Sequence, residues 1–146
     1  MSTIREQIML AVMVIAQAVP GMAAASVTRE RDRAVQEGEC PALDVEPDNE
    51  PAPQALGTGG DKRALSLRFT INTVGAGASA LADPIVKALH SGLYLDPTLG
   101  GLAATIIPGE TEFSREAAGR TIGRTTLIYT VVYTTSRSDL SAKARS

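Results

Sequence analysis

The sequence predicts an α+β fold in which an antiparallel or mixed sheet of four to five strands has two helices packed on one face. Two observations lead to this prediction. In several segments apolar and polar residues alternate, as in strands with one solvent-exposed face. These segments lie before and after a segment whose apolar residues have helical spacing. A second helical stretch opens the chain. The 146 residues fit a single domain over 1–136, followed by a polar C-terminal tail at 137–146.

The first predicted helix covers residues 4–18. Thr3 and Glu6 form a T-x-x-E capping box at its start, and Pro20 follows its end. Apolar residues recur at helical spacing on one face: Ile4, Ile8, Val12 and Ile15. Most other positions are apolar too. We therefore expect this helix to be covered on more than one side, by its own domain or by a neighbouring subunit.

The same segment has an alternative interpretation as a secretory signal peptide. Arg5 precedes the apolar run at 8–16, and small residues follow it at 22–26. Glu6 cancels the charge of Arg5, however, and a capping box is typical of an ordinary helix. The run is also shorter than the roughly 20 residues that span a bilayer. A structural helix is the favoured interpretation.

The segment at 22–35 is rich in arginine. Read as a strand, it places three basic residues on one face: Arg29, Arg31 and Arg33. One interpretation is a solvated edge strand whose charges prevent unwanted pairing. The other is a polar subunit contact or channel wall, in which these arginines meet acidic groups of a neighbouring subunit.

The segment at 36–61 is acidic and contains no Lys or Arg. It begins with a short strand around Ala42–Val45, and we take three of its carboxylates as candidate contacts for the arginines: Glu46, Asp48 and Glu50. Three prolines and three glycines predict that 47–61 is a long mobile loop that does not pair into the sheet and that the fold does not need. The spacing of an EF-hand calcium loop is absent.

Three further strands are predicted. The clearest is 62–74, where Leu67 and Phe69 point inward and Ser66 and Arg68 outward. A strand at 103–115 is interrupted at Pro108 and Gly109. The last strand, 120–135, is apolar on both faces and should be central or covered on both sides.

The second helix is predicted over 79–93, with Ser79 as a candidate N-cap and a helix start as late as Asp83 because of Pro84. Its expected buried stripe consists of Leu81, Ile85, Ala88 and Leu89. The single histidine, His90, has no nucleophile or metal ligand near it in sequence, so a structural role is expected.

No pattern of catalytic residues is found, and we expect neither an enzyme nor a bound cofactor or metal. One Cys and one His exclude an intramolecular disulfide and a zinc site built mainly from these residues. A Walker loop and a nucleophile elbow are absent. The glycines after the 62–74 strand fit only a relaxed dinucleotide motif, beside a sheet that looks antiparallel. A net charge of −2 and 3% aromatic residues disfavour a general nucleic-acid binder.

Five phrases of the chain carry a resemblance that spans residues 3–135: TIREQIMLAVMVIA, CPALDVEP, KRALSLRFTIN, ADPIVKALHSGLYLDPTLGGLA and TTLIYTVVYTT. Together they resemble the small tail-terminator, or tail-completion, proteins of long-tailed bacteriophages and phage-like particles. The helix with its D-P-T-L-G-G-L turn and the closing Y-x-V-x-Y-x-T strand are the most specific of them. None of the phrases is catalytic.

The resemblance implies a structural virion protein that forms a ring, expected to be hexameric, at the head-proximal end of the tail. Such a ring caps the completed tail tube, stops its polymerisation and offers a docking surface to the head–tail connector or neck proteins. The implied partners are further copies of the chain, the tail tube protein and the neck. DNA only passes through the lumen, no membrane is involved, and assembly takes place in the host cytoplasm.

Two alternatives remain open. One is a head-completion or neck adaptor ring of the same particle. The other is a small secreted or periplasmic binding domain, which applies if residues 1–25 are a signal peptide.

Overall fold

Two long antiparallel strands form the centre of the fold. They belong to a computed structural model that describes residues 2–75, 77–118 and 120–144. Its helices are α1 (Ile4–Gln17) and α2 (Ala78–Leu95), with short 3-10 turns at Ala24–Ser26 and Glu37–Glu39. Its strands are β1 (Val27–Arg29), β2 (Ala42–Asn49), β3 (Gln54–Ala55), β4 (Gly60–Val74), β5 (Thr105–Ala118) and β6 (Arg120–Ser136).

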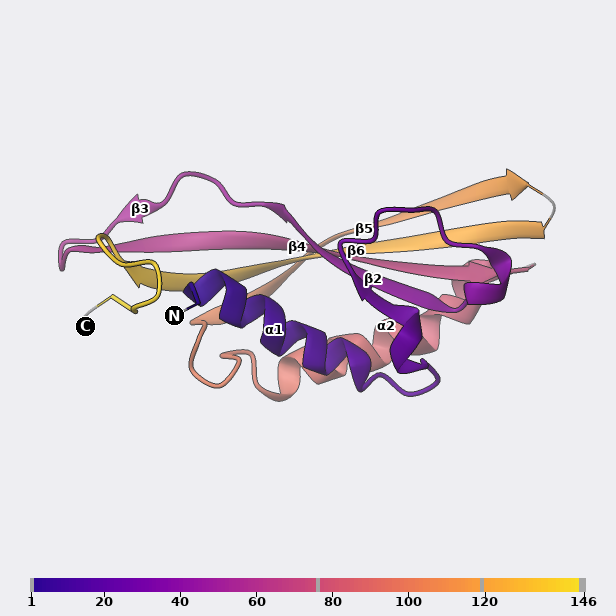
Figure 1. Cartoon of the computed structure of the whole chain (residues 1–146), viewed down its shortest axis with the longest axis horizontal. Helices are drawn as coiled ribbons and strands as arrows, with labels where there is room; N and C mark the ends of the chain where they lie inside the picture. The colour runs from indigo at the N-terminus through magenta and orange to yellow at the C-terminus, as the bar shows by residue number, and fades with distance from the viewer. Residues whose placement is uncertain (1, 76, 119, 145–146) are drawn as a thin grey trace.

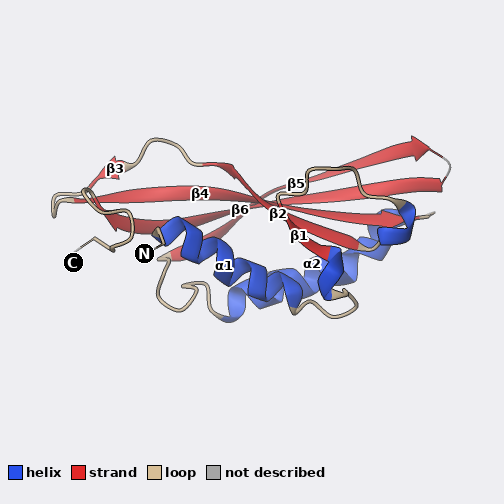
Figure 2. Ribbon diagram, in the orientation of Figure 1, coloured by secondary structure: helices blue, strands red, loops and turns tan. Residues whose placement is uncertain are grey.

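The six strands form one mixed sheet. Its main order is β1-β2-β4-β6-β5, and β3 pairs with the start of β4 off this path. Only β1 and β2 run parallel; every other neighbouring pair is antiparallel. Both helices lie on the same face of the sheet (Figures 1 and 2). The α+β prediction is therefore confirmed, with β3 as a strand beyond those expected.

The core lies between the helices and the sheet. In β4, Leu67 and Phe69 are 1% and 0% exposed, and their register partners in β6 are Tyr129 and Leu127. The rings of Phe69 and Tyr129 meet edge to face with centroids 5.6 Å apart. Ser66 and the other alternate residues of β4 point to the opposite face, so the predicted register is confirmed.

Helix α1 begins as the capping box predicts, because the Thr3 side chain accepts a hydrogen bond from the backbone of Glu6. Its buried side consists of Ile4, Ile8, Met9, Val12 and Ala16. Met13 and Ile15 are partly buried against the core, whereas Leu10 and Val14 are 52% and 67% exposed, so the described residues leave the outer side of this helix uncovered. Within the described residues, no helix is long and apolar enough to cross a membrane.

Helix α2 differs from the prediction at its start and in its buried face. Its N-cap is Gly77, whose φ of 72° is a conformation that glycine adopts without strain, so Ser79 already lies in the first turn. Pro84 lies inside the helix and does not define its start. The buried positions are Ala78, Ala82, Ile85, Leu89 and Leu93. Leu81 is 53% exposed, because the stripe that faces the sheet runs through Ala82 instead.

The segments at 22–35 and 47–61 also differ from the prediction. The arginine-rich strand ends at Arg29, because Glu30 has a positive φ of 52° and turns the chain. The prediction of one unpaired loop at 47–61 is wrong: Asn49 still pairs with β4, and β3 and the first residues of β4 follow. Pro47 is tolerated because β1 ends opposite Val45, which leaves β2 as the sheet edge beyond that point.

Two further features shape the sheet. The predicted interruption of the 103–115 strand is a register shift between Pro108 and Thr111 of β5, the outermost strand. The C-terminal segment folds back onto the domain: the Ile4 amide donates to the Leu140 carbonyl at 2.9 Å, and the Ser136 amide donates to the Ala142 carbonyl at 2.7 Å.

Substitutions at neighbouring positions of β4 test this register. Leu67→Asp should destabilise the protein by several kcal/mol, because it places a carboxylate in the core. Ser66→Asp, on the other face, should change stability by no more than about 0.5 kcal/mol. Urea unfolding of both variants measures the difference, and equal effects would contradict the register.

Candidate functional site

The six residues proposed as interface candidates all form ion pairs within the chain. They do not form one site. They fall into four groups along the sheet, and in none of them does a candidate arginine meet a candidate carboxylate. The groups are Arg29 with Glu6, Arg31 and Arg33 with Glu39, Glu46 and Asp48 with Arg68, and Glu50 with Arg5 and Arg63.

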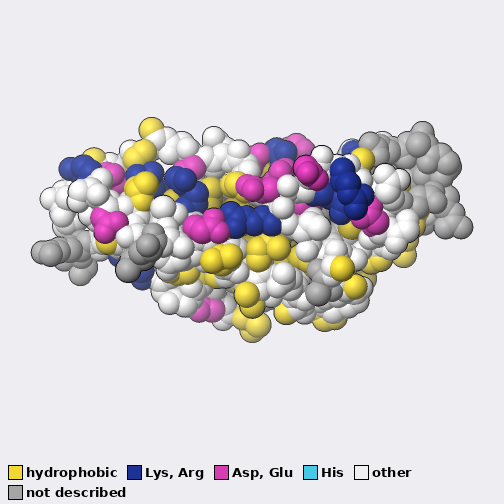
Figure 3. Space-filling view, viewed as in Figure 1, with side chains coloured by type: hydrophobic (Ala, Val, Ile, Leu, Met, Phe, Trp, Pro, Cys, Tyr) yellow, Lys and Arg dark blue, Asp and Glu magenta, His cyan; other side chains and the backbone are white. Residues whose placement is uncertain are grey.

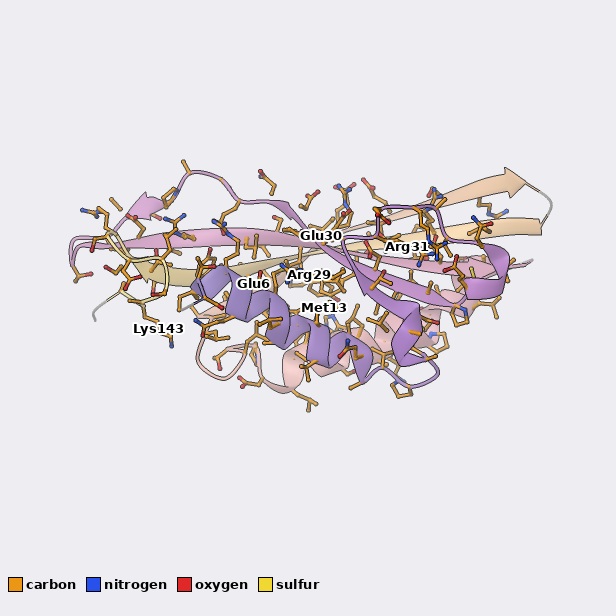
Figure 4. All side chains as sticks on the ribbon, viewed as in Figure 1. Glu6, Met13, Arg29, Glu30, Arg31 and Lys143 are labelled. Atoms are coloured by element: carbon orange, nitrogen blue, oxygen red, sulfur yellow. The ribbon has the colours of Figure 1, made fainter. Side chains whose placement is uncertain are left out.

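Arg29 links the end of β1 to the first turn of α1 (Figure 4). Its two terminal nitrogens donate to the two carboxylate oxygens of Glu6 at 2.7 and 2.8 Å. These bonds lower the pKa of Glu6 and raise that of Arg29. The bidentate geometry orients α1 against the sheet, a role that sequence spacing alone does not show.

Arg31 and Arg33 close the turn that follows β1. Both donate to Glu39, at 2.5 Å from Arg31 and 3.0 Å from Arg33. The hydrogen bonds from Arg31, from the Gln36 amide and from Arg33 lower the pKa of Glu39 to about 2. The Arg31 amide also donates to Asp44 of β2 at 3.0 Å. These arginines therefore fold a loop back onto β2.

Glu46 and Asp48 flank one arginine of β4. Arg68 lies 2.6 Å from Asp48 and 3.6 Å from Glu46, on the face of the sheet opposite the helices. Because these side chains are partly exposed, the ion pairs contribute little to stability. On this face, which we call the open face of the sheet, the guanidinium of Arg68 is shared by two carboxylates.

Glu50 is the most enclosed of the candidate carboxylates, with a side chain that is 11% exposed. It accepts hydrogen bonds from Arg5 at 2.5 Å and from the Tyr133 hydroxyl at 2.6 Å, and Arg63 lies 3.5 Å away. It thus joins the start of α1 to β4 and β6 just after β2 ends. The segment that we expected to be mobile is anchored at this point.

The ionisation of this cluster follows from its burial. Burial by itself raises the pKa of Glu50, but the hydrogen bonds from Arg5 and Tyr133 outweigh it and hold that pKa below its ordinary value. Burial, followed by the hydrogen bond to Glu50, raises the pKa of Tyr133 to about 12. The carboxylate is therefore ionised and the phenol protonated at neutral pH, which is the state that the hydrogen bond requires.

His90 takes part in an aromatic cluster. Its Nδ1 lies 2.8 Å from the Tyr129 hydroxyl, and its ring contacts that of Tyr94 at a tilt of 33° with centroids 4.6 Å apart. The Tyr94 hydroxyl donates to the Ile106 carbonyl at 2.6 Å. These bonds tie α2 to β5 and β6, as the structural role predicted for His90 implies.

Two cavities flank helix α2. One, of about 460 Å³, lies between the start of α2 and the β5–β6 hairpin, and the described residues of its lining include Phe113, Arg115 and Arg124. The other, of about 340 Å³, is lined by Lys87, His90 and Tyr129 among others. Over the described ranges, no three His, Cys, Asp or Glu side chains gather as metal ligands would.

Sequence reasoning missed one surface, the open face of the sheet. The helices cover the face that carries Leu127, Tyr129 and Val131, while Ile128 and Val132 point to the other side. Ile107 of β5 is 50% exposed on this open face. The signal was present in the apolar residues on both faces of the last predicted strand.

Comparisons with known proteins add no assignment. No family model matches the chain, and neither does any curated protein.

The Glu50 cluster predicts a pH-dependent contribution to stability. Because the folded pKa lies below the ordinary value of 4.5, ionised Glu50 stabilises the fold above that pH, and this contribution is lost as the pH falls further. Glu50→Gln should cost about 1–2 kcal/mol at pH 7 and progressively less in acid. Asp48→Asn, in an exposed pair, should cost about 0.5 kcal/mol or less. Urea unfolding at several pH values measures both free energies. If the free-energy cost of Glu50→Gln does not change with pH, ionised Glu50 does not stabilise the fold in this way.

The same cluster determines which part of the 47–61 segment the fold needs. Replacing 51–58 by a short Gly-Ser turn keeps Glu50 and should change stability by about 1 kcal/mol or less. Replacing all of 47–61 should cost several times more, since it removes Glu50, Asp61 and the end of β2. Thermal unfolding of the two variants measures the contrast, and equal melting temperatures would show that the anchor is dispensable.

Proposed function

We propose that the chain is a structural subunit of a ring that caps the tail tube of a long-tailed phage or phage-like particle. The observation that carries the proposal is apolar surface left over after the core is complete. Leu10 and Val14 of α1 and Ile107 of β5 are each at least half exposed, while the core beneath them is closed. A chain that must associate with further copies needs such surface. The resemblance of the sequence to tail-terminator proteins supplies the kind of assembly.

The charges bear on which surface makes the contact. The candidate arginines are engaged with Glu6 and Glu39 of their own chain, which leaves them as positioning groups for loops and helices. The contact itself is then expected to form through the apolar faces.

In this proposal the partners are further copies of the chain, the tail tube protein and the head–tail connector. The ring, expected to have six copies, sits at the head-proximal end of the virion tail, and DNA passes through its lumen. A neck adaptor ring of the same particle is the second candidate. The interpretation as a secreted domain is disfavoured, because residues 1–25 include α1, whose Ile8 and Val12 are fully buried in the core.

Electron microscopy of the purified protein, alone and with tail tubes of its particle, tests the proposal. We expect rings of the 15.2 kDa chain at one end of the tubes and tubes that stop growing once capped. Both conditions are needed because ring closure can depend on the tube. Binding to isolated connectors but not to tubes would favour the neck adaptor. A protein that stays monomeric and unbound with both partners present would exclude either ring.

A further inference from the structure

The smaller of the two cavities beside α2 lies where strand β5 departs from regular pairing. The register of β5 shifts between Pro108 and Thr111, which is a β-bulge. The bulge forms one wall of the cavity and helix α2 forms the other, so we call it the bulge cavity. Its volume of about 340 Å³ is at the lower end of the roughly 300–1,000 Å³ that small-molecule sites enclose.

The polar side chains of the bulge cavity have hydrogen-bonding capacity to spare. Lys87, His90 and Ser91 come from one flank of α2 at helical spacing, and Thr111 comes from β5. The side chains of Lys87, Ser91 and Thr111 are exposed and form no hydrogen bond or ion pair with any residue that the structure describes. An ammonium group only donates hydrogen bonds, and a hydroxyl can donate one. All three groups can therefore bind an oxygen ligand.

His90 presents a further donor. Burial raises the pKa of Tyr129, so its hydroxyl stays protonated, and His90 Nδ1 at 2.8 Å is the only hydrogen-bond partner it has among the described residues. Because a buried hydroxyl without an acceptor is costly, the hydroxyl donates to Nδ1 when the ring is neutral, which puts the ring hydrogen on Nε2. A protonated ring carries a hydrogen on both nitrogens. Nε2 is thus a donor in either state.

The carboxylates that are nearest in sequence lie outside the bulge cavity. Glu112 stands opposite Thr126 on the open face of the sheet, and the Glu110 side chain is hydrogen-bonded to Glu112. Asp83, one turn before Lys87 in α2, is exposed, does not line the cavity and forms no ion pair with Lys87. On the face shown in Figure 3, by contrast, basic and acidic side chains lie next to one another. The described lining of the bulge cavity holds one cation and no carboxylate.

We propose that the bulge cavity binds a small carboxylate that carries an apolar group. One ammonium group balances one negative charge, and the imidazole and the hydroxyls can donate to the carboxylate oxygens. Val86, Pro108 and Leu127 supply apolar walls for the remainder of the ligand. A free acid and the C-terminal end of a protein chain share this chemistry. The inference goes beyond the proposed function and does not depend on it.

Nuclear magnetic resonance of the chain without tail tubes tests the site. His90 is the single histidine, so its imidazole protons give signals that no other histidine overlaps. Benzoate, acetate and benzamide are titrated at constant pH and ionic strength. We expect benzoate to shift these signals until they saturate, and acetate, which lacks the ring, to bind severalfold more weakly. Benzamide has the ring without the charge and should not bind.

Two lysine variants show whether the ammonium group takes part. Lys87→Gln should weaken benzoate binding about three- to tenfold, because it removes the cation from the lining. Lys62→Gln is the matched control, since Lys62 is exposed on β4 and does not line the cavity. Both side chains are exposed, so both variants should fold.

A further ligand distinguishes the two sources of the carboxylate. N-acetylphenylalanine has the carboxylate of a peptide C-terminus, so tighter binding than that of benzoate assigns the site to a chain end, and weaker binding assigns it to a free acid.

Three outcomes overturn the proposal. Equal binding of benzoate and benzamide would show an apolar cleft that does not recognise anions. Benzoate binding that Lys87→Gln leaves unchanged would place the carboxylate elsewhere, and signals that never saturate would exclude the site. None of these results bears on tube capping, which the microscopy of tail tubes tests separately.

Discussion

The pairing of β4 with β6 is the interaction on which the rest of the structure depends. The two strands run antiparallel in unbroken register from Gly60 opposite Ser136 to Val74 opposite Ile122. The ladder places the side chains of Leu67, Phe69 and Tyr129 on one face, where the helices pack. On one side of this ladder β2 pairs with β4, and on the other side β5 pairs with β6. Because α2 and β5 lie between its two strands in the sequence, the ladder closes a long loop, and its contacts are long-range ones.

The elements with a strong internal period could be predicted from the sequence. The alternation around Leu67 and the capping box at Thr3 identified β4 and the start of α1 because their signals are local. Strand β3 could not be predicted, since Gln54 and Ala55 have no strand preference and pair only because the chain returns beside β4. The buried face of α2 was predicted only in part. Leu81 was expected to be buried because it is the larger apolar residue, but its neighbour Ala82 faces the sheet and Leu81 is exposed.

The candidate site was predicted as a set of residues but not as a geometry. Glu50 lies 45 residues from Arg5 and 83 residues from Tyr133 in the sequence, so no sequence motif predicts their contact. The charges of the chain look like binding groups in the sequence, yet in three dimensions they fasten α1, the 30–39 turn and the end of β2 to the sheet. The extent of the exposed apolar surface could not be predicted from composition either, because it depends on how the two helices cover the sheet.

The irregular edge strand has a consequence for how copies can associate. An exposed strand of 14 residues would ordinarily be a template for another strand, and growth by that route has no natural end. In β5, the shift at Pro108 and Gly109 breaks the ladder of free amides and carbonyls, and the two carboxylates that follow repel a like strand from a second copy. The middle of β5 therefore cannot form a continuous ladder of hydrogen bonds with another strand. The irregular edge therefore disfavours the pairing of β5 with a strand of another copy.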